Sequence, residues 1–129
     1  MGEIAVGLRG QVVARVTADQ TAAALGSGDV PAFGTPALVA LVEAAAVNAL
    51  AGRLPPDETT VGTWLEVRHL AATPVGAEVR AEATLVAVEG RKLTFTVIAY
   101  DDRGTIGEGR HERMMLSRDR FLAKLAAAR

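Results

Sequence analysis

The sequence predicts an α+β domain in which a curved antiparallel sheet of about five strands wraps one long central helix. Three features carry the prediction: a long apolar helix, one strand segment before it, and four strand segments after it. The helix is apolar round its whole circumference, and a flat sheet would cover only one side of it. We therefore expect the sheet to curl round the helix rather than to lie flat beneath it as in a plain α+β sandwich.

The first elements are short. Alternating residues over 11–17 predict a strand, and Thr17 to Gln20 has the spacing of a capping box for a short helical turn. Glycine, serine and proline between residues 26 and 31 then interrupt regular structure. The helix that follows is the first long element of the chain.

The long helix is predicted over residues 36–51. Thr35 is the expected N-cap, Pro36 fits the first turn, and Gly52 with the prolines at 55 and 56 ends the helix. After it come four strands separated by turn residues and a final helix over 118–128 that Ser117 would cap. The predicted strands span Thr59–Leu70, Ala77–Val88, Lys92–Tyr100 and Thr105–Leu116.

The chain has the size of one domain, which we assign to residues 1–129. A helix wrapped by a curved antiparallel sheet is the hot-dog arrangement. Because such a domain usually covers the rest of its helix with a second copy, we expect a homodimer whose sheets join edge to edge.

Composition excludes several classes of function. The formal net charge of −1 gives no electrostatic case for binding nucleic acid or a membrane surface. The chain has no cysteine, which excludes disulfides and thiolate catalysis, and no His or acidic cluster has metal-ligand spacing. We therefore expect neither a metal nor a cofactor. The N-terminal residues lack the pattern of a secretory signal, so we expect a cytoplasmic protein.

Glu43 is the most informative residue, because it is a carboxylate in the middle of the apolar helix. Burying an ionised side chain costs several kcal/mol unless it has partners, and Asn48 lies too far round the helix to form a solvated stripe with it. Buried carboxylates cluster at sites of acid or base chemistry. A structural role for Glu43 is the alternative.

Two histidines require an interpretation. His69 is in register with Val61, Thr63, Leu65 and Val67, so we expect it to face the core and the helix that carries Glu43, in one subunit or across the dimer. A packing role is the alternative for His69. His111 lies among charged residues, and we interpret it as a sheet-surface residue.

Two sequence blocks resemble the fluoroacetyl-CoA thioesterase family of hot-dog proteins. The more specific block has Gly62 seven residues before His69, followed by Ala-Ala-Thr-Pro at 71–74, and the other runs from Ala32 through Thr35-Pro36 to Glu43. The similarity continues through Val88-Glu-Gly-Arg91 to Gly109-Arg-His-Glu-Arg113, and it covers nearly the whole chain.

The resemblance implies catalytic roles for Thr35, Glu43 and His69, with Gly62 lining the acyl pocket. We also expect Phe33 and Gly34, beside Thr35, to contact substrate. The fluoroacetate-specialised member of the family has a phenylalanine lid a few residues before its threonine, whereas residues 29–32 here contain no aromatic side chain. Small residues are expected to leave room for a larger acyl group: Ala32, Gly34, Ala37, Ala40, Ala44 and Gly62.

These observations predict an acyl-CoA thioesterase that acts on a small or medium acyl group. Glu43 and His69 would activate water, or Glu43 would attack directly, while Thr35 donates an orienting hydrogen bond. Two alternatives remain open: a hot-dog protein that binds acyl-CoA or another hydrophobic ligand without turnover, and a hot-dog dehydratase or hydratase.

Overall fold

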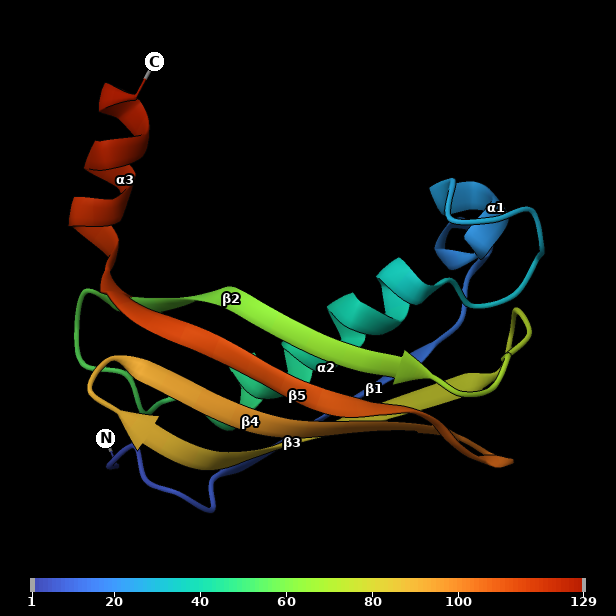
Figure 1. The fold of residues 1–129 in the computed structure, drawn as a ribbon, viewed down its shortest axis with the longest axis horizontal. Coiled ribbons are helices and arrows are strands. Elements are labelled where there is room, and N and C mark those ends of the chain that lie inside the picture. Colours follow the sequence, from blue (N-terminus) through green and yellow to red (C-terminus); the bar gives the residue numbers. More distant parts are fainter. Residues whose placement is uncertain (1, 129) are drawn as a thin grey trace.

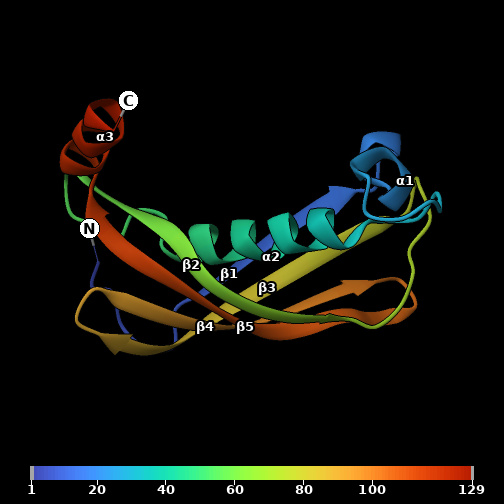
Figure 2. The ribbon, with the colours of Figure 1, turned by 45° about the horizontal axis from the view of Figure 1, so that its top comes forward.

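A computed structural model describes residues 2–128, in which five strands form one antiparallel sheet in the order β1-β3-β4-β5-β2. The long helix α2 crosses one face of this sheet, and the sheet curves beneath it (Figures 1 and 2). The strands are β1 (Arg9–Arg15), β2 (Glu58–His69), β3 (Glu78–Glu89), β4 (Lys92–Asp101) and β5 (Gly104–Ser117). The helices are η1 (Ala18–Gln20), α1 (Ala22–Leu25), α2 (Thr35–Ala49) and α3 (Arg118–Ala127).

Every long element that the sequence predicts is present, with ends within about two residues of those expected. The short helix α1 is the element that the sequence did not predict. The Gln20 side chain accepts a hydrogen bond from the Thr17 backbone N–H, as the predicted capping box requires. The Ser117 hydroxyl accepts from the Arg120 N–H and caps α3.

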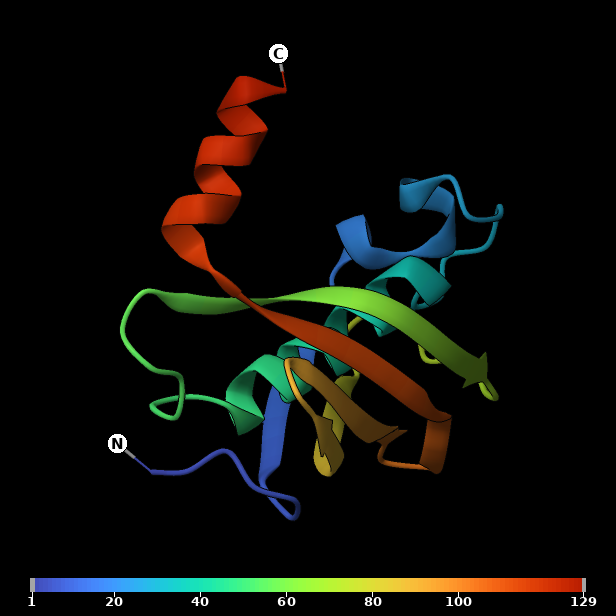
Figure 3. The ribbon, with the colours of Figure 1, turned by 60° about the vertical axis from the view of Figure 1, so that its left-hand side comes forward.

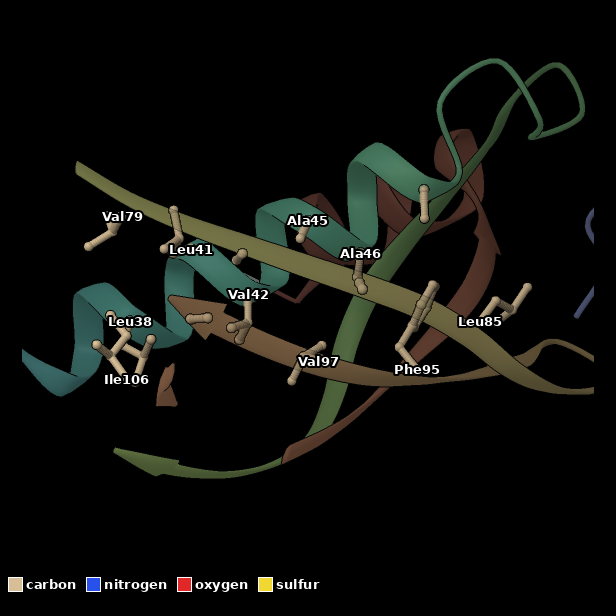
Figure 4. Close-up of a cluster of buried hydrophobic side chains, with 14 of the residues drawn as sticks. Leu38, Leu41, Val42, Ala45, Ala46, Val79, Leu85, Phe95, Val97 and Ile106 are labelled. Atoms are coloured by element: carbon tan, nitrogen blue, oxygen red, sulfur yellow. The ribbon is translucent and has the colours of Figure 1, made fainter. Parts of the chain in front are cut away.

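The core lies between α2 and the concave face of the sheet. Leu38, Val42 and Ala45 of the helix are fully buried against β3 and β4, where Leu85 and Phe95 are also fully buried (Figure 4). Gly10 of β1 permits close packing, because a Cβ at this position would lie 2.2 Å from the Ala45 carbonyl oxygen. Small residues on both elements therefore bring the helix directly onto the sheet.

One side of α2 is not covered by the single chain. Val47 is 50% exposed, and Pro36, Ala40 and Ala44 are exposed as well. The sequence predicted a helix surrounded on all sides, and a single subunit does not achieve this. Apolar side chains that stay exposed along a central helix favour a further covering partner.

The two edges of the sheet differ. At the β1 edge, the Asn48 side chain of α2 accepts a hydrogen bond of 3.0 Å from the Gln11 backbone N–H. The 12-residue strand β2 forms the opposite edge, and the helix α3 extends away from the sheet near the Glu58 end of this strand (Figure 3). No helix within residues 2–128 is long and apolar enough to span a membrane.

Candidate active site

A β-bulge in β2 sets which of its side chains face the helix. The pairing of β2 with β5 shifts between Gly62 and Trp64, so Gly62 and His69 both point inward although their numbers differ in parity. Thr60 is also inward, since its hydroxyl contacts the inward Arg113. The prediction that Val61 and Thr63 share a face with His69 is therefore wrong, because the bulge reverses the alternation at that point.

Thr35 and His69 form a hydrogen-bonded pair at the N-terminal end of α2. The Thr35 Oγ1 lies 2.8 Å from the His69 Nδ1. We expected Thr35 to be the N-cap of α2, but the N-cap is Gly34. Pro36 lies in the first turn, as expected. Because Thr35 does not cap the helix, its hydroxyl is available to the imidazole.

This pair opens onto a pocket of about 350 Å³. Gly34 and Phe33 line the pocket, as the sequence predicted for substrate contacts, although Phe33 is only 3% exposed and belongs to the core. The His69 Nε2 atom is buried and has no hydrogen-bond partner within residues 2–128. A buried ring nitrogen without a partner requires an explanation, and a catalytic role or a missing partner is a standard one.

Some of the small residues expected around the acyl group lie elsewhere. Ala32 and Gly34 line the pocket beside Thr35. Ala37, Ala40 and Ala44 instead line a separate apolar groove of about 410 Å³ between α2 and β1. The expectation that all of them shape one pocket is therefore wrong, because Ala32 and Gly34 precede α2, whereas Ala37, Ala40 and Ala44 lie on the side of α2 that faces β1.

Glu43 lies in a second polar cluster, farther along α2. Its Oε2 is 3.2 Å from the Arg113 Nη1 and 3.8 Å from the His111 Nε2. Gly62 packs directly on the carboxylate, because a Cβ at that position would lie 2.5 Å from Oε2. The Glu43 side chain is 39% exposed in the single chain, so it is half-buried rather than enclosed.

The two clusters are separate within one chain. Thr35 and Glu43 are eight residues apart, which corresponds to about 12 Å along the helix axis. His69 is paired with Thr35, and Glu43 is paired with Arg113. The predicted cooperation of Glu43 with His69 is therefore not found inside a single subunit.

His111 is not the surface residue that the sequence analysis expected. It is 1% exposed, its ring stacks on Phe95 with centroids 6.4 Å apart, and its Nδ1 lies 2.8 Å from the Trp64 carbonyl oxygen. Burial lowers the pKa of His111, and the positive charge of Arg113 lowers it further, against the opposing effects of the Trp64 carbonyl and Glu43. The ring is therefore neutral at pH 7.

Arg113 is a site residue that the sequence analysis missed. Burial lowers its pKa, whereas the Glu43 carboxylate raises it, and a guanidinium stays charged in proteins. The alternation of inward and outward side chains along β5 could have identified it. Glu108, Arg110 and Glu112 point outward, so His111 and Arg113 alternate with them and must point inward.

Among residues 2–128, no group of three side chains suited to binding a metal comes together.

Comparisons with known proteins identify the family. The sequence profile of the fluoroacetyl-CoA-specific thioesterases matches residues 16–119. The chain belongs to this family. A curated relative, the fluoroacetyl-CoA thioesterase of Streptantibioticus cattleyicolor, is 44% identical over 93 residues, which cover 72% of this chain and 67% of the relative. The family predicted from the sequence is confirmed, and with it the class of enzyme, a thioester hydrolase.

Solved structures confirm the hot-dog fold. A mutant of the fluoroacetyl-CoA-specific thioesterase FlK superposes with a TM-score of 0.91 at 36% identity, over 100% of both chains. An FlK mutant in complex with acetyl-CoA superposes with a TM-score of 0.92 at 35% identity, over 97% of this chain and 98% of the FlK chain. A thioesterase superfamily member of Thermus thermophilus superposes with a TM-score of 0.90 at 29% identity, over 99% of this chain and 95% of the Thermus chain.

Proposed function

We propose that this protein hydrolyses small acyl-CoA thioesters at a site that contains Thr35, His69 and Glu43. The hydrogen bond of 2.8 Å between the Thr35 hydroxyl and the His69 imidazole is the observation that carries the proposal. A hydroxyl within hydrogen-bond reach of an imidazole is the arrangement of an activated nucleophile and its base. The relatives support the substrate class, since one is named as a fluoroacetyl-CoA thioesterase and a mutant of FlK was solved with acetyl-CoA.

The geometry favours attack by the Thr35 hydroxyl. His69 Nδ1 accepts the hydroxyl proton while Oγ1 bonds to the thioester carbon, and the thiolate of coenzyme A then leaves with that proton. A water molecule, activated by the same nitrogen, hydrolyses the acyl ester and regenerates Thr35. The oxyanion would form beside the first turn of α2, where the N–H groups of Thr35 and Ala37 have no partner within the helix.

Glu43 would enter this site from a second subunit. If Nδ1 accepts the Thr35 proton, Nε2 carries the other ring proton, and this buried atom has no partner within residues 2–128. Glu43 of the partner subunit is suited to accept that hydrogen bond. The three side chains would then form a carboxylate, imidazole and hydroxyl series in which the carboxylate stabilises the imidazolium that forms.

The register of strand β2 supports such a dimer. Antiparallel pairing of two β2 edges about an axis at Glu66 would pair Trp64 with Arg68 of the partner subunit and, past the bulge at residue 63, Gly62 with His69 of the partner subunit. Because Gly62 contacts Glu43 within each chain, the same pairing brings Glu43 of the partner subunit toward His69. The opposite edge is less suited to pairing, since Asn48 already occupies a β1 backbone N–H.

The acyl group is proposed to be short and not restricted to fluoroacetyl. Phe33 is the aromatic residue on the lining of the Thr35 pocket, and it is fixed in the core rather than placed as a lid. Without a dedicated contact, fluorine and hydrogen on an acetyl group differ too little in size for strong discrimination. The proposed substrate also supports the predicted cytoplasmic location, because coenzyme A thioesters are intracellular metabolites.

Release of thiol from a graded series of acyl-CoAs tests this function. We expect multiple turnovers with acetyl-CoA, loss of turnover in Thr35→Ala and His69→Ala, and normal turnover in the control Thr105→Ala, which removes an exposed hydroxyl near the start of β5. Mass spectrometry of quenched reactions should show an acyl group on Thr35. Binding without thiol release would favour the ligand-binding alternative, and a change in double-bond absorbance would favour the dehydratase or hydratase.

A further inference from the structure

We propose that His111 is a positioning residue: as a neutral ring it accepts a hydrogen bond from Arg113 and so fixes the guanidinium that holds Glu43. This inference rests on the proposed function, because it requires Glu43 to take part in hydrolysis. His111 itself lies under Gly62 and beside Phe95, and it acts through Arg113 rather than on the substrate.

The partners of His111 determine where its proton lies. The Trp64 carbonyl oxygen, 2.8 Å from Nδ1, can only accept a hydrogen bond, so Nδ1 carries the proton. Arg113 Nη1, 3.1 Å from Nε2, can only donate, so Nε2 offers a lone pair. Both contacts are satisfied only by the neutral ring. The 3.8 Å approach of Nε2 to Glu43 is therefore not an ion pair.

The guanidinium of Arg113 is fixed at all three nitrogen atoms. Nε donates to the Thr60 hydroxyl at 2.9 Å, and Nη2 donates to the Thr60 carbonyl at 3.1 Å. Nη1 is shared between the His111 Nε2 at 3.1 Å and the Glu43 Oε2 at 3.2 Å. Thr60 orients one end of the group and His111 the other, so the direction of the Nη1 atom toward Glu43 depends on both.

This arrangement divides the two oxygen atoms of Glu43 between two tasks. The hydrogen-bond and ion-pair contacts of Glu43 within residues 2–128 all use Oε2. Oε1 is thus left for a group outside the chain, which in the proposed dimer is the imidazole of His69 of the partner subunit.

Protonation of His111 would disrupt the cluster. A proton on Nε2 would point at the Arg113 Nη1 and place a second positive charge beside it. The charged groups near the ring are Arg113 and Glu43 on its inward side and the neighbouring Glu112 on the same strand. His111 is therefore useful only as a neutral acceptor, which the structure secures by burying it.

Three variants test the assignment. His111→Gln can still present an acceptor near the position of Nε2, whereas His111→Leu cannot. Phe95→Leu, the matched control, alters the packing against the ring and leaves every hydrogen bond of the cluster in place. We expect His111→Leu to lower kcat about tenfold or more with KM changed by less than about twofold, since misplacement of a reacting group by about 1 Å has effects of this size or larger.

The expected pattern includes rescue: His111→Gln should retain most of the kcat that His111→Leu loses, and Phe95→Leu should lower only the melting temperature. Equal kcat values for His111→Leu and Phe95→Leu would overturn the proposal.

Nitrogen-15 NMR of the wild-type imidazoles gives a readout that needs no turnover and no variant. We expect His111 to be neutral at pH 7 with its proton on Nδ1, and a proton on Nε2 would overturn the proposal. If the wild-type enzyme is active, Glu43→Gln is inactive and His111→Leu is unimpaired, only this inference fails. If Glu43→Gln keeps full activity, the proposed function fails.

Discussion

Replacing Gly62 by alanine is expected to lower kcat about a hundredfold and to leave the fold stable. A Cβ at this position would lie 2.5 Å from the Glu43 Oε2, whereas ordinary van der Waals contacts begin at 3.4 Å. The carboxylate would have to move by almost 1 Å. Because it is the far end of a flexible side chain, that movement costs little folding energy but displaces the group that the proposed site requires.

The added Cβ would lie farther from the other neighbours of Gly62 than from Glu43. The same Cβ would lie 3.1 Å from the His111 Cε1 and 3.4 Å from the Arg113 Nη1, so the cluster would adjust by a few tenths of an ångström there. We expect the free energy of unfolding to change by about 1 kcal/mol or less, in contrast to the large kinetic effect.

Two glycine variants provide matched controls. Gly28→Ala should be neutral in both rate and stability, because its Cβ would make only an ordinary contact of 3.5 Å with Ala22. Gly109→Ala should unfold the protein or lower its melting temperature strongly, because its Cβ would collide with the Glu66 carbonyl oxygen of the backbone. Thiol release from acetyl-CoA and thermal unfolding are the assays. A Gly62→Ala enzyme with wild-type kcat would refute the reasoning.

Four further predictions follow from the same structure. Thr35→Ala and His69→Ala should each lower hydrolysis at least about a hundredfold, and the double variant should be little worse than either, since residues that act as a unit are not additive. Light scattering at micromolar concentration should give twice the chain mass of 13.4 kDa, and a stable, active monomer would contradict the dimer. Competition kinetics should give a kcat/KM ratio for fluoroacetyl-CoA over acetyl-CoA below about two hundred, whereas a ratio in the tens of thousands would reveal a gate that we have not identified. Because burial lowers the pKa of His111, the unfolded chain binds a proton below about pH 6.5 that the folded chain does not. As the pH falls below this value, the free energy of unfolding should decrease by up to about 1.4 kcal/mol per pH unit. The decrease should be smaller in His111→Gln.

The helix and strands could be predicted from the sequence because their signals are local. The prolines and glycines that bound α2, and the alternation along each strand, gave ends within about two residues of those observed. The exact cap was not predictable in the same way. Thr35 and Gly34 are both acceptable N-caps, and the choice of Gly34 is what frees the Thr35 hydroxyl for His69.

The division of the site into two clusters could not be predicted, since it depends on tertiary geometry. The bulge between Gly62 and Trp64 changes which side chains of β2 face inward, and Gly62, a glycine inside the strand, was the one local sign of it. The inward orientation of His111 and Arg113 was available from parity along β5. The sequence analysis missed this orientation because the segment contains many charged residues, most of which point outward.

Complementation between two inactive variants tests the shared site most directly. A mixture of Glu43→Gln and His69→Ala chains, allowed to exchange subunits, forms heterodimers in which one site has Thr35 and His69 from the first chain and Glu43 from the second. Random pairing predicts recovery of about a quarter of wild-type activity, because half of the dimers are mixed and each has one complete site. Exchange of subunits without any recovery of hydrolysis would contradict a site built from two chains.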